Sequence, residues 1–312
     1  MDKDQEEYEN LKKSKFKQQK LSAWRPVPTK LCASIIFFAF GVIFIIIGII
    51  ILFYTNKIEE ISYRYDDKCN KGDSNCKITL KIQNNMDRNI MVYYKLNGFY
   101  QNHRRYINSK SDSQLKGEFI DYEAMKASGD CDPVITNKDM GKTNSVNNNN
   151  PLNEDDVAIP CGLMAKSFFN DNFKKWELKT NLGSEEIHVN ENDIAWRAEY
   201  KNIDLDKQWI DMTNEHFIVW MKPSGLPDFK KLWGRITDRD LKAGNEIEVT
   251  IDNKYDVSSF NGEKYLILST TNSLGGKNTF LSISYIVIGA ISVILCAIFN
   301  ATHYFFLKKK EE

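Results

Sequence analysis

The chain has 312 residues, and its 42 basic and 42 acidic side chains leave no formal net charge at pH 7. A neutral chain has no global field to attract nucleic acid, so composition argues against a nucleic-acid partner and says little more. The distribution of charge is more informative, because residues 31–54 and 280–307 contain no Asp, Glu, Lys or Arg.

The first uncharged stretch, residues 31–54, predicts a transmembrane helix. Its 24 residues would form a helix roughly 36 Å long, against about 30 Å for the hydrocarbon core of a bilayer. A buried helix of a soluble protein would be shorter and carry a polar face, whereas residues 35–53 are apolar all round. The run is too long for a cleaved signal peptide, and no A-x-A-like site follows Tyr54.

The second uncharged stretch, residues 280–307, predicts a second span. Residues 281–299 are nearly long enough by themselves, and Asn300 and His303 then interrupt the apolar run. These two side chains share one helix face, where we expect an interfacial or partner-facing position rather than a proton relay.

The charges that flank the two spans predict their direction. Residues 11–30 contain seven basic and no acidic side chains, and three lysines follow residue 307. Basic residues collect on the cytosolic side of a membrane. We therefore expect cytosolic tails at residues 1–30 and 308–312, with residues 55–279 on the far side as an ectodomain.

Four cysteines lie in this ectodomain, and an even number in an oxidising compartment predicts two disulfides. Of the three possible pairings, the sequence favours Cys69 with Cys76, across a turn-rich Gly-Asp-Ser-Asn, and Cys131 with Cys161. A zinc site is the alternative, but the chain has no C-x-x-C pair and no histidines at matching spacing.

The ectodomain pattern favours strands over helices. Alternation of β-branched or aromatic residues at period two predicts antiparallel strands at 77–83, 90–96, 216–222, 246–251 and 264–270. Asn261-Gly262 predicts a two-residue hairpin, and residues 168–175 and 227–232 predict short helices. The predicted fold class is a membrane protein with two transmembrane α-helices and a large β-rich ectodomain of antiparallel sandwich type.

Residues 140–153 are polar and rich in Asn, which predicts a flexible insertion within the ectodomain. We assign it no function. The ectodomain also contains no N-x-S/T glycosylation site, since the single match begins at Asn300 inside the second span.

The chain shows no arrangement of residues for catalysis. Gly141-Lys142-Thr143 lacks the first glycine of a phosphate-binding loop, and the four histidines have no metal-ligand spacing, so we expect no cofactor and no metal. His103-Arg104-Arg105 could meet lipid phosphates or an acidic partner loop, although ordinary ion pairing is the favoured interpretation. The tryptophans at 196, 209, 220 and 233 are expected in the sandwich core rather than in a ligand cage.

Long segments resemble one family over nearly the whole chain. They read FKQQKLSAWRP at 16–26, YYKLNGFYQNHRRY at 93–106, PCGLMAKSFFNDNF at 160–173, HFIVWMKPSGLPDFKKLWGRI at 216–236 and GGKNTFL at 275–281. The family is that of cell cycle control protein 50, or ligand-effect modulator, whose members are β-subunits of the type IV P-type ATPases that flip lipids. The missing glycosylation sites and the Asn-rich insertion depart from its pattern.

The resemblance implies a non-catalytic accessory subunit rather than an enzyme. It implies a heterodimer with the catalytic subunit of a type IV P-type ATPase, which moves membrane phospholipid from the exoplasmic to the cytosolic leaflet. Such a subunit lets its ATPase leave the endoplasmic reticulum and supports its transport cycle. The implied location is the endoplasmic reticulum, the Golgi and endosomes, or the plasma membrane.

Residues expected to bind the partner fall into two groups. The cytosolic segment would run along the ATPase through Phe16, Lys17, Gln18, Gln19, Trp24 and Pro26. Small residues in the spans let helices approach closely, and the candidates named here are Gly41, Gly48 and Gly289. An equally good interpretation is that these glycines are simply tolerated.

Two other function classes compete with this one. Some channel subunits also have two spans, cytosolic ends and a cysteine-bonded ectodomain, although those ectodomains usually need more than four cysteines. A membrane-anchored enzyme is disfavoured because no nucleophile, base or metal set is present. Lys309 and Lys310 match the spacing of a dilysine retrieval signal, but a simple cytosolic anchor is preferred.

Overall fold

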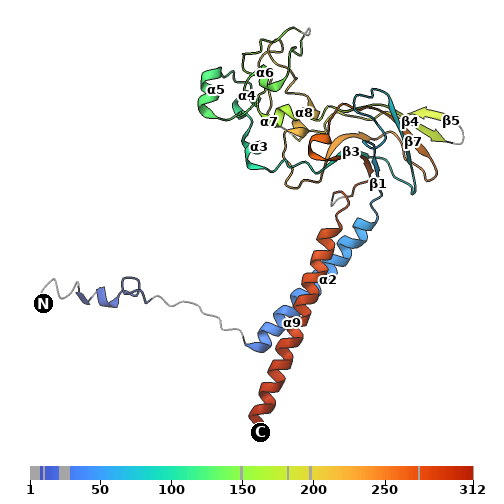
Figure 1. Cartoon of the computed structure of the whole chain (residues 1–312). Helices are drawn as coiled ribbons and strands as arrows, with labels where there is room; N and C mark the ends of the chain where they lie inside the picture. Colours follow the sequence, from blue (N-terminus) through green and yellow to red (C-terminus); the bar gives the residue numbers. More distant parts are fainter. Residues whose placement is uncertain are drawn as a thin grey trace. The chain divides into compact units, whose positions relative to one another are not determined.

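The computed structural model describes residues 8–9, 11–20, 29–147, 150–180, 183–196, 199–272 and 275–311, with side chains to 306. The chain divides into two compact units. One unit combines Met1–Phe53 with Asn278–Glu312, and the other is Tyr54–Lys277 (Figure 1).

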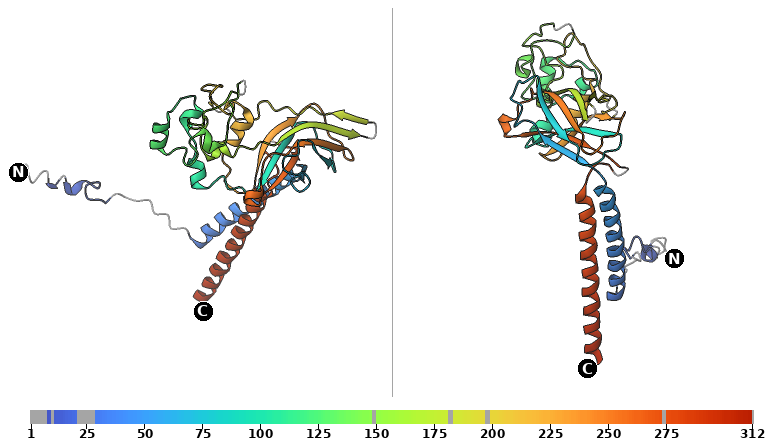
Figure 2. Two further views of the ribbon diagram at one scale, coloured as in Figure 1. Left: turned by 45° about the horizontal axis from the view of Figure 1, so that its top comes forward. Right: turned by 90° about the vertical axis from the view of Figure 1, so that its right-hand side faces the viewer.

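The first unit contains two long helices, α2 (Lys30–Asn56) and α9 (Thr279–Glu311). Within the described residues these are the two helices long and apolar enough to cross a membrane. Figures 1 and 2 show them side by side. Most of their apolar side chains are exposed, as expected where lipid rather than water surrounds a helix, and the predicted pair of transmembrane helices is confirmed.

The second unit contains two antiparallel sheets, each with four strands among the described residues. The first has the order β1-β8-β3-β6 and is built from β1 (Glu60–Arg64), β3 (Ile90–Asn97), β6 (Phe229–Ile236) and β8 (Glu263–Ser269). The second has the order β2-β7-β4-β5 and is built from β2 (Cys76–Lys81), β4 (Asn172–Thr180), β5 (Gly183–Glu186) and β7 (Glu246–Asp252). The predicted β-rich ectodomain is confirmed.

A shared core lies between the sheets. Along β3, burial alternates at period two, because every second side chain points into the core. Phe173 of β4 packs edge-on against Trp233 of β6, with ring centroids 4.9 Å apart, and Tyr94 of β3 stacks on Phe169 at 4.0 Å. Aromatic side chains from both sheets therefore fill the interior of a sandwich.

The strand predicted at 216–222 is wrong, because this segment contains the helix α8 (Glu215–Trp220). Asn214 caps the helix, since its side chain accepts hydrogen bonds from the backbone of His216 and Phe217. The buried residues of α8 are Phe217, Ile218 and Trp220. Phe217 and Trp220 are three positions apart, as on one face of a helix, whereas Ile218 and Trp220 are two apart, as on one face of a strand.

The helices predicted at 168–175 and 227–232 are also wrong, because neither segment contains a helix, and β4 and β6 begin within them at Asn172 and Phe229. The predicted hairpin at Asn261-Gly262 does not form. Residues Ser258–Phe260 form a 3₁₀ turn, and the next strand, β8, pairs with β1 and β3 instead of its preceding neighbour. The structure of these segments depends on pairing with strands that are distant in sequence, which a local sequence pattern cannot reveal.

A helical lobe, residues 98–147 and 150–171, lies at one end of the ectodomain (Figure 1). Its described helices are α3 (Arg104–Asn108), α4 (Asp112–Leu115), α5 (Tyr122–Ser128), α6 (Asn137–Met140) and α7 (Leu163–Lys166). Such short helices depend on their caps, and Thr136 with Asp139 forms a capping box at the start of α6.

The predicted insertion at 140–153 belongs to this lobe. Its described residues, 140–147 and 150–153, fold back on themselves through backbone hydrogen bonds from Ser145 to Asn150 and from Leu152 to Thr143. Met140 and Ser145 are buried. The flexibility of the segment stays a prediction.

Candidate partner-binding surfaces

The three glycines expected at a partner contact lie where α2 and α9 meet each other. A Cβ atom added to Gly41 would lie 2.8 Å from Val293 Cγ2 and 3.0 Å from the carbonyl oxygen of Gly289. One added to Gly48 would lie 2.7 Å from Ile286 Cγ1. Glycine lets two backbones approach this closely in lipid, so these positions stabilise the pairing of the chain's own spans.

A polar contact joins the same two helices. Asn300 Nδ2 donates a hydrogen bond to Ser34 Oγ at 2.7 Å, and Ser34 Oγ lies 3.2 Å from Cys296 Sγ. Ser34 and Cys296 are both buried between the spans. Asn300 thus contacts the chain's own first span in this structure, and a partner-facing role for it stays a prediction.

The remaining faces of both spans are apolar and exposed. They present large side chains at Phe38, Phe40, Ile49 and Phe53 of α2 and at Ile283, Val287, Ile291, Ile294 and Ile298 of α9. These faces can contact lipid or the helices of another protein. Use of Gly41, Gly48 or Gly289 by a partner stays a prediction.

The cytosolic segment expected to bind the partner is described only in part. Residues 16–19 are exposed, and the side chain of Phe16 is 76% exposed. Such a large apolar side chain in water is a candidate contact for another protein. Trp24 and Pro26 lie outside the described residues.

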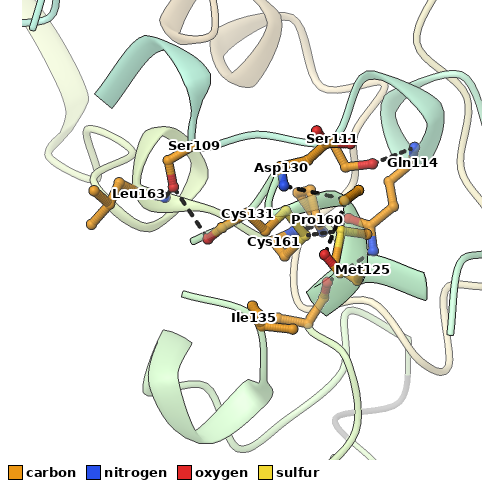
Figure 3. The surroundings of a disulfide bond; sticks show 12 residues. Ser109, Ser111, Gln114, Met125, Asp130, Cys131, Ile135, Pro160, Cys161 and Leu163 are labelled. Carbon is orange, nitrogen blue, oxygen red and sulfur yellow. Dashed lines mark hydrogen bonds between the residues drawn. A yellow bond between two sulfur atoms is a disulfide. The ribbon is translucent and has the colours of Figure 1, made fainter. Parts of the chain in front are cut away.

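The two favoured disulfides, Cys69–Cys76 and Cys131–Cys161, are present in the ectodomain. Figure 3 shows the second of them beside the side chain of Gln114, whose Oε1 accepts a hydrogen bond from the Cys161 backbone at 3.0 Å. The first bond fastens the start of β2, and the second fastens the helical lobe.

Gly162, next to this disulfide, has a steric role. Its φ angle is +100°, and a Cβ atom there would lie 2.2 Å from the carbonyl oxygen of Ser109. The Ser109 hydroxyl also accepts a hydrogen bond from the backbone of Leu163 at 2.8 Å. Only glycine permits this close backbone approach, which explains one residue of the family-like segment at 160–173.

A buried ion pair joins the two sheets, and no pattern in the sequence indicates it. Lys264 Nζ of β8 lies 2.7 Å from Asp171 Oδ2, directly before β4, and the side chains are 2% and 0% exposed. Tyr65 donates a hydrogen bond to the same carboxylate oxygen at 2.8 Å. Burial lowers the pKa of Lys264, and the Asp171 carboxylate opposes that shift. Each buried charge is therefore compensated by an opposite charge in direct contact with it.

A second buried lysine, Lys231 of β6, contacts the C-terminal end of α8. Its ammonium donates to the backbone carbonyls of Val219 at 3.0 Å and Trp220 at 3.3 Å, at the C-terminal end of α8. Burial, with Lys222 nearby, lowers its pKa to about 7. The side chain thus fixes α8 against the sheet.

The other candidate groups give no catalytic arrangement. The described residues contain no cluster of His, Cys, Asp or Glu that could hold a metal ion. Arg104 and Arg105 are exposed and form no ion pair within the described part of the chain, unlike the ordinary pairing that was favoured. Trp220 and Trp233 lie in the core as predicted, whereas the prediction for Trp196 is wrong because it is 80% exposed.

Comparison with known proteins decides the family. Residues 51–310 match the model of the LEM3 (ligand-effect modulator 3) family, also described as the CDC50 family. The chain belongs to this family. It is 38% identical to "ALA-interacting subunit 3" of Arabidopsis thaliana, over 93% of this chain and 85% of the relative. It is 33% identical to "Cell cycle control protein 50A" of Bos taurus, over 90% of this chain and 85% of the relative.

Membership of the family agrees with the structure. The match covers the whole ectodomain and the second span. Together with the two apolar helices, it makes the chain an integral membrane protein.

Proposed function

We propose that this protein is the non-catalytic accessory subunit of a type IV P-type ATPase that moves phospholipid across a membrane. The observation that carries the proposal is the family match over residues 51–310, supported by relatives that are named as interacting subunits.

The topology we propose places both termini in the cytosol and residues 55–279 on the exoplasmic side. The basic segments 11–30 and 308–310 support this direction. The two disulfides also support it, because such bonds persist outside the reducing cytosol.

In the complex we propose, the paired spans act as one unit. Because Gly41, Gly48 and Gly289 already pack α2 against α9, the ATPase helices would contact the exposed apolar faces on the outside of that pair. The ectodomain would cap the exoplasmic loops of the ATPase, and residues 16–26 would run along its cytosolic face. Such a complex would leave the endoplasmic reticulum only after assembly.

Affinity capture tests the proposal. A tagged full-length chain, extracted in mild detergent, should recover a P-type ATPase that mass spectrometry identifies in near-equal amount. Replacing residues 16–26 with a Gly-Ser segment of equal length should reduce the recovery, whereas the same replacement of residues 140–153 should leave it unchanged. If the unaltered chain recovers no P-type ATPase, the proposal is wrong.

A further inference from the structure

A dense run of positive charge lies shortly before the first span. Residues 12–20, here called the basic segment, contain five lysines and no acidic side chain. All five are exposed, and they are Lys12, Lys13, Lys15, Lys17 and Lys20. The segment therefore presents a strongly positive surface to its surroundings.

Most of this charge is not neutralised by the protein itself. Lys13 lies 3.5 Å from Glu9, whereas the other four lysines form no ion pair with any residue that the structure describes. Like charges so close in sequence repel one another, and a surface of opposite charge relieves that repulsion. The basic segment therefore favours a partner with many negative charges.

An apolar side chain stands in the middle of the same segment. Phe16 is 76% exposed, and the backbone forms a compact turn around it, because Gln18 donates to the carbonyl oxygen of Ser14 at 3.0 Å and Lys20 donates to that of Lys15 at 2.8 Å. Orienting the span requires the positive charges but not the ring. Lysines combined with an exposed aromatic ring are typical of segments that lie on a membrane surface.

The bilayer is always within reach of the basic segment. Lys20 and Lys30 are ten positions apart, so whatever the conformation between them the distance is at most about 36 Å. Lys30 begins α2, which crosses the membrane. Docking on the bilayer is thus an intramolecular event, for which weak binding is sufficient. Nothing holds an acidic protein surface equally close.

We propose that the basic segment docks on anionic lipid of the cytosolic leaflet in the subunit that has not yet bound its ATPase. The lipid headgroups supply the negative charge, and the ring of Phe16 lies among them. Assembly then moves residues 16–20 from the lipid to the ATPase, where the proposed function uses residues 16–26. The inference rests on the proposed topology, because anionic lipid is concentrated in the cytosolic leaflet.

Fluorescence of the full-length chain in lipid nanodiscs tests this docking. A nitrobenzoxadiazole dye is attached through Gln18→Cys in a chain with Cys32→Ser and Cys296→Ser, which replace the free cysteines that the structure describes. The emission should be brighter and blue-shifted in discs of phosphatidylcholine with phosphatidylserine, relative to phosphatidylcholine alone. Raising the salt from about 0.1 M to about 1 M shortens the Debye length from about 10 Å to about 3 Å and should remove the difference.

Variants separate the contributions of charge and ring. Lys15→Gln should lower the ratio of docked to free segment about fivefold, which corresponds to about 1 kcal/mol per lysine at an anionic surface. Replacing all five lysines with Gln should abolish the response to phosphatidylserine. Phe16→Ala should lower the ratio but leave its salt dependence unchanged. Lys116→Gln is the matched control and should change nothing, since Lys116 is an exposed lysine of the ectodomain.

Two results would overturn the proposal. One is equal emission in the two lipid mixtures, which would leave the basic segment to a protein partner. The other is an equal effect of Lys15→Gln and Lys116→Gln. The discs contain no ATPase, so a failure here would leave the proposed function intact, and a failure to capture an ATPase would leave the lipid docking intact.

Discussion

The two spans and the ectodomain are stabilised in opposite ways. In α2 and α9, most large apolar side chains are exposed, and the contact depends on glycines and on the bond from Asn300 to Ser34. In the ectodomain, the aromatic side chains lie inside, with two disulfides and a buried ion pair. In lipid there is no hydrophobic driving force between apolar side chains, so the contact between α2 and α9 depends on close packing. In the ectodomain, the hydrophobic effect of water drives the burial of apolar side chains.

The largest effect is expected at the buried ion pair. Lys264→Met leaves the Asp171 carboxylate buried without its cation, which should lower the free energy of unfolding by about 3–5 kcal/mol. Tryptophan fluorescence during denaturant unfolding measures this in the full-length chain, because neither span contains a tryptophan.

Lys81→Met is the matched control for that measurement. Lys81 forms an exposed ion pair with Glu246 at 3.4 Å, and its loss should cost less than about 1 kcal/mol. Equal losses for the two variants would show that the buried pair does not join the sheets as described.

An intermediate effect is expected at the disulfides, because a longer closed loop restricts the unfolded chain more. Serine at both Cys131 and Cys161, which are 30 positions apart, should cost about 3.5 kcal/mol. Serine at both Cys69 and Cys76, 7 positions apart, should cost about 2.5 kcal/mol. The same fluorescence measurement compares them, and the reverse order would contradict the loop-length account.

The smallest effect is expected in the membrane. Asn300→Leu removes the hydrogen bond to Ser34, worth about 0.6 kcal/mol between transmembrane helices, and should raise the labelling rate of Cys296 about threefold. The thiol reagent N-ethylmaleimide measures this in a chain with Cys32→Ser, since Cys32 and Cys296 are the free cysteines that the structure describes. His303→Leu is the control and should leave the rate unchanged.

The sequence predicted elements whose signal is local. Both spans were evident because apolar runs without charge need no knowledge of the fold, and four strands were found where one face is buried. The prediction for 216–222 was wrong because its apolar residues fit a strand and a helix equally, and the cap at Asn214 favours the helix. The helix prediction for 227–232 was wrong because β6 depends on pairing with β3, which is distant in sequence.

The candidate sites show the same limit. The four ectodomain cysteines could be identified and paired from spacing, but nothing near Lys264 indicates that Asp171, 93 residues away, would be its partner. Likewise, Gly41 and Gly289 were recognisable as contact residues, whereas their contact with each other required the structure.

The pairing of β1 with β8 has a mechanical consequence. Glu60 lies opposite Ser269, so the first and last strands of the ectodomain end side by side. A force that separated these two ends would break the hydrogen bonds between β1 and β8 one after another, rather than all together. The ectodomain would then unfold sequentially from this edge, at a far lower force than a sheet in which the force acts along the strands and loads all the hydrogen bonds together.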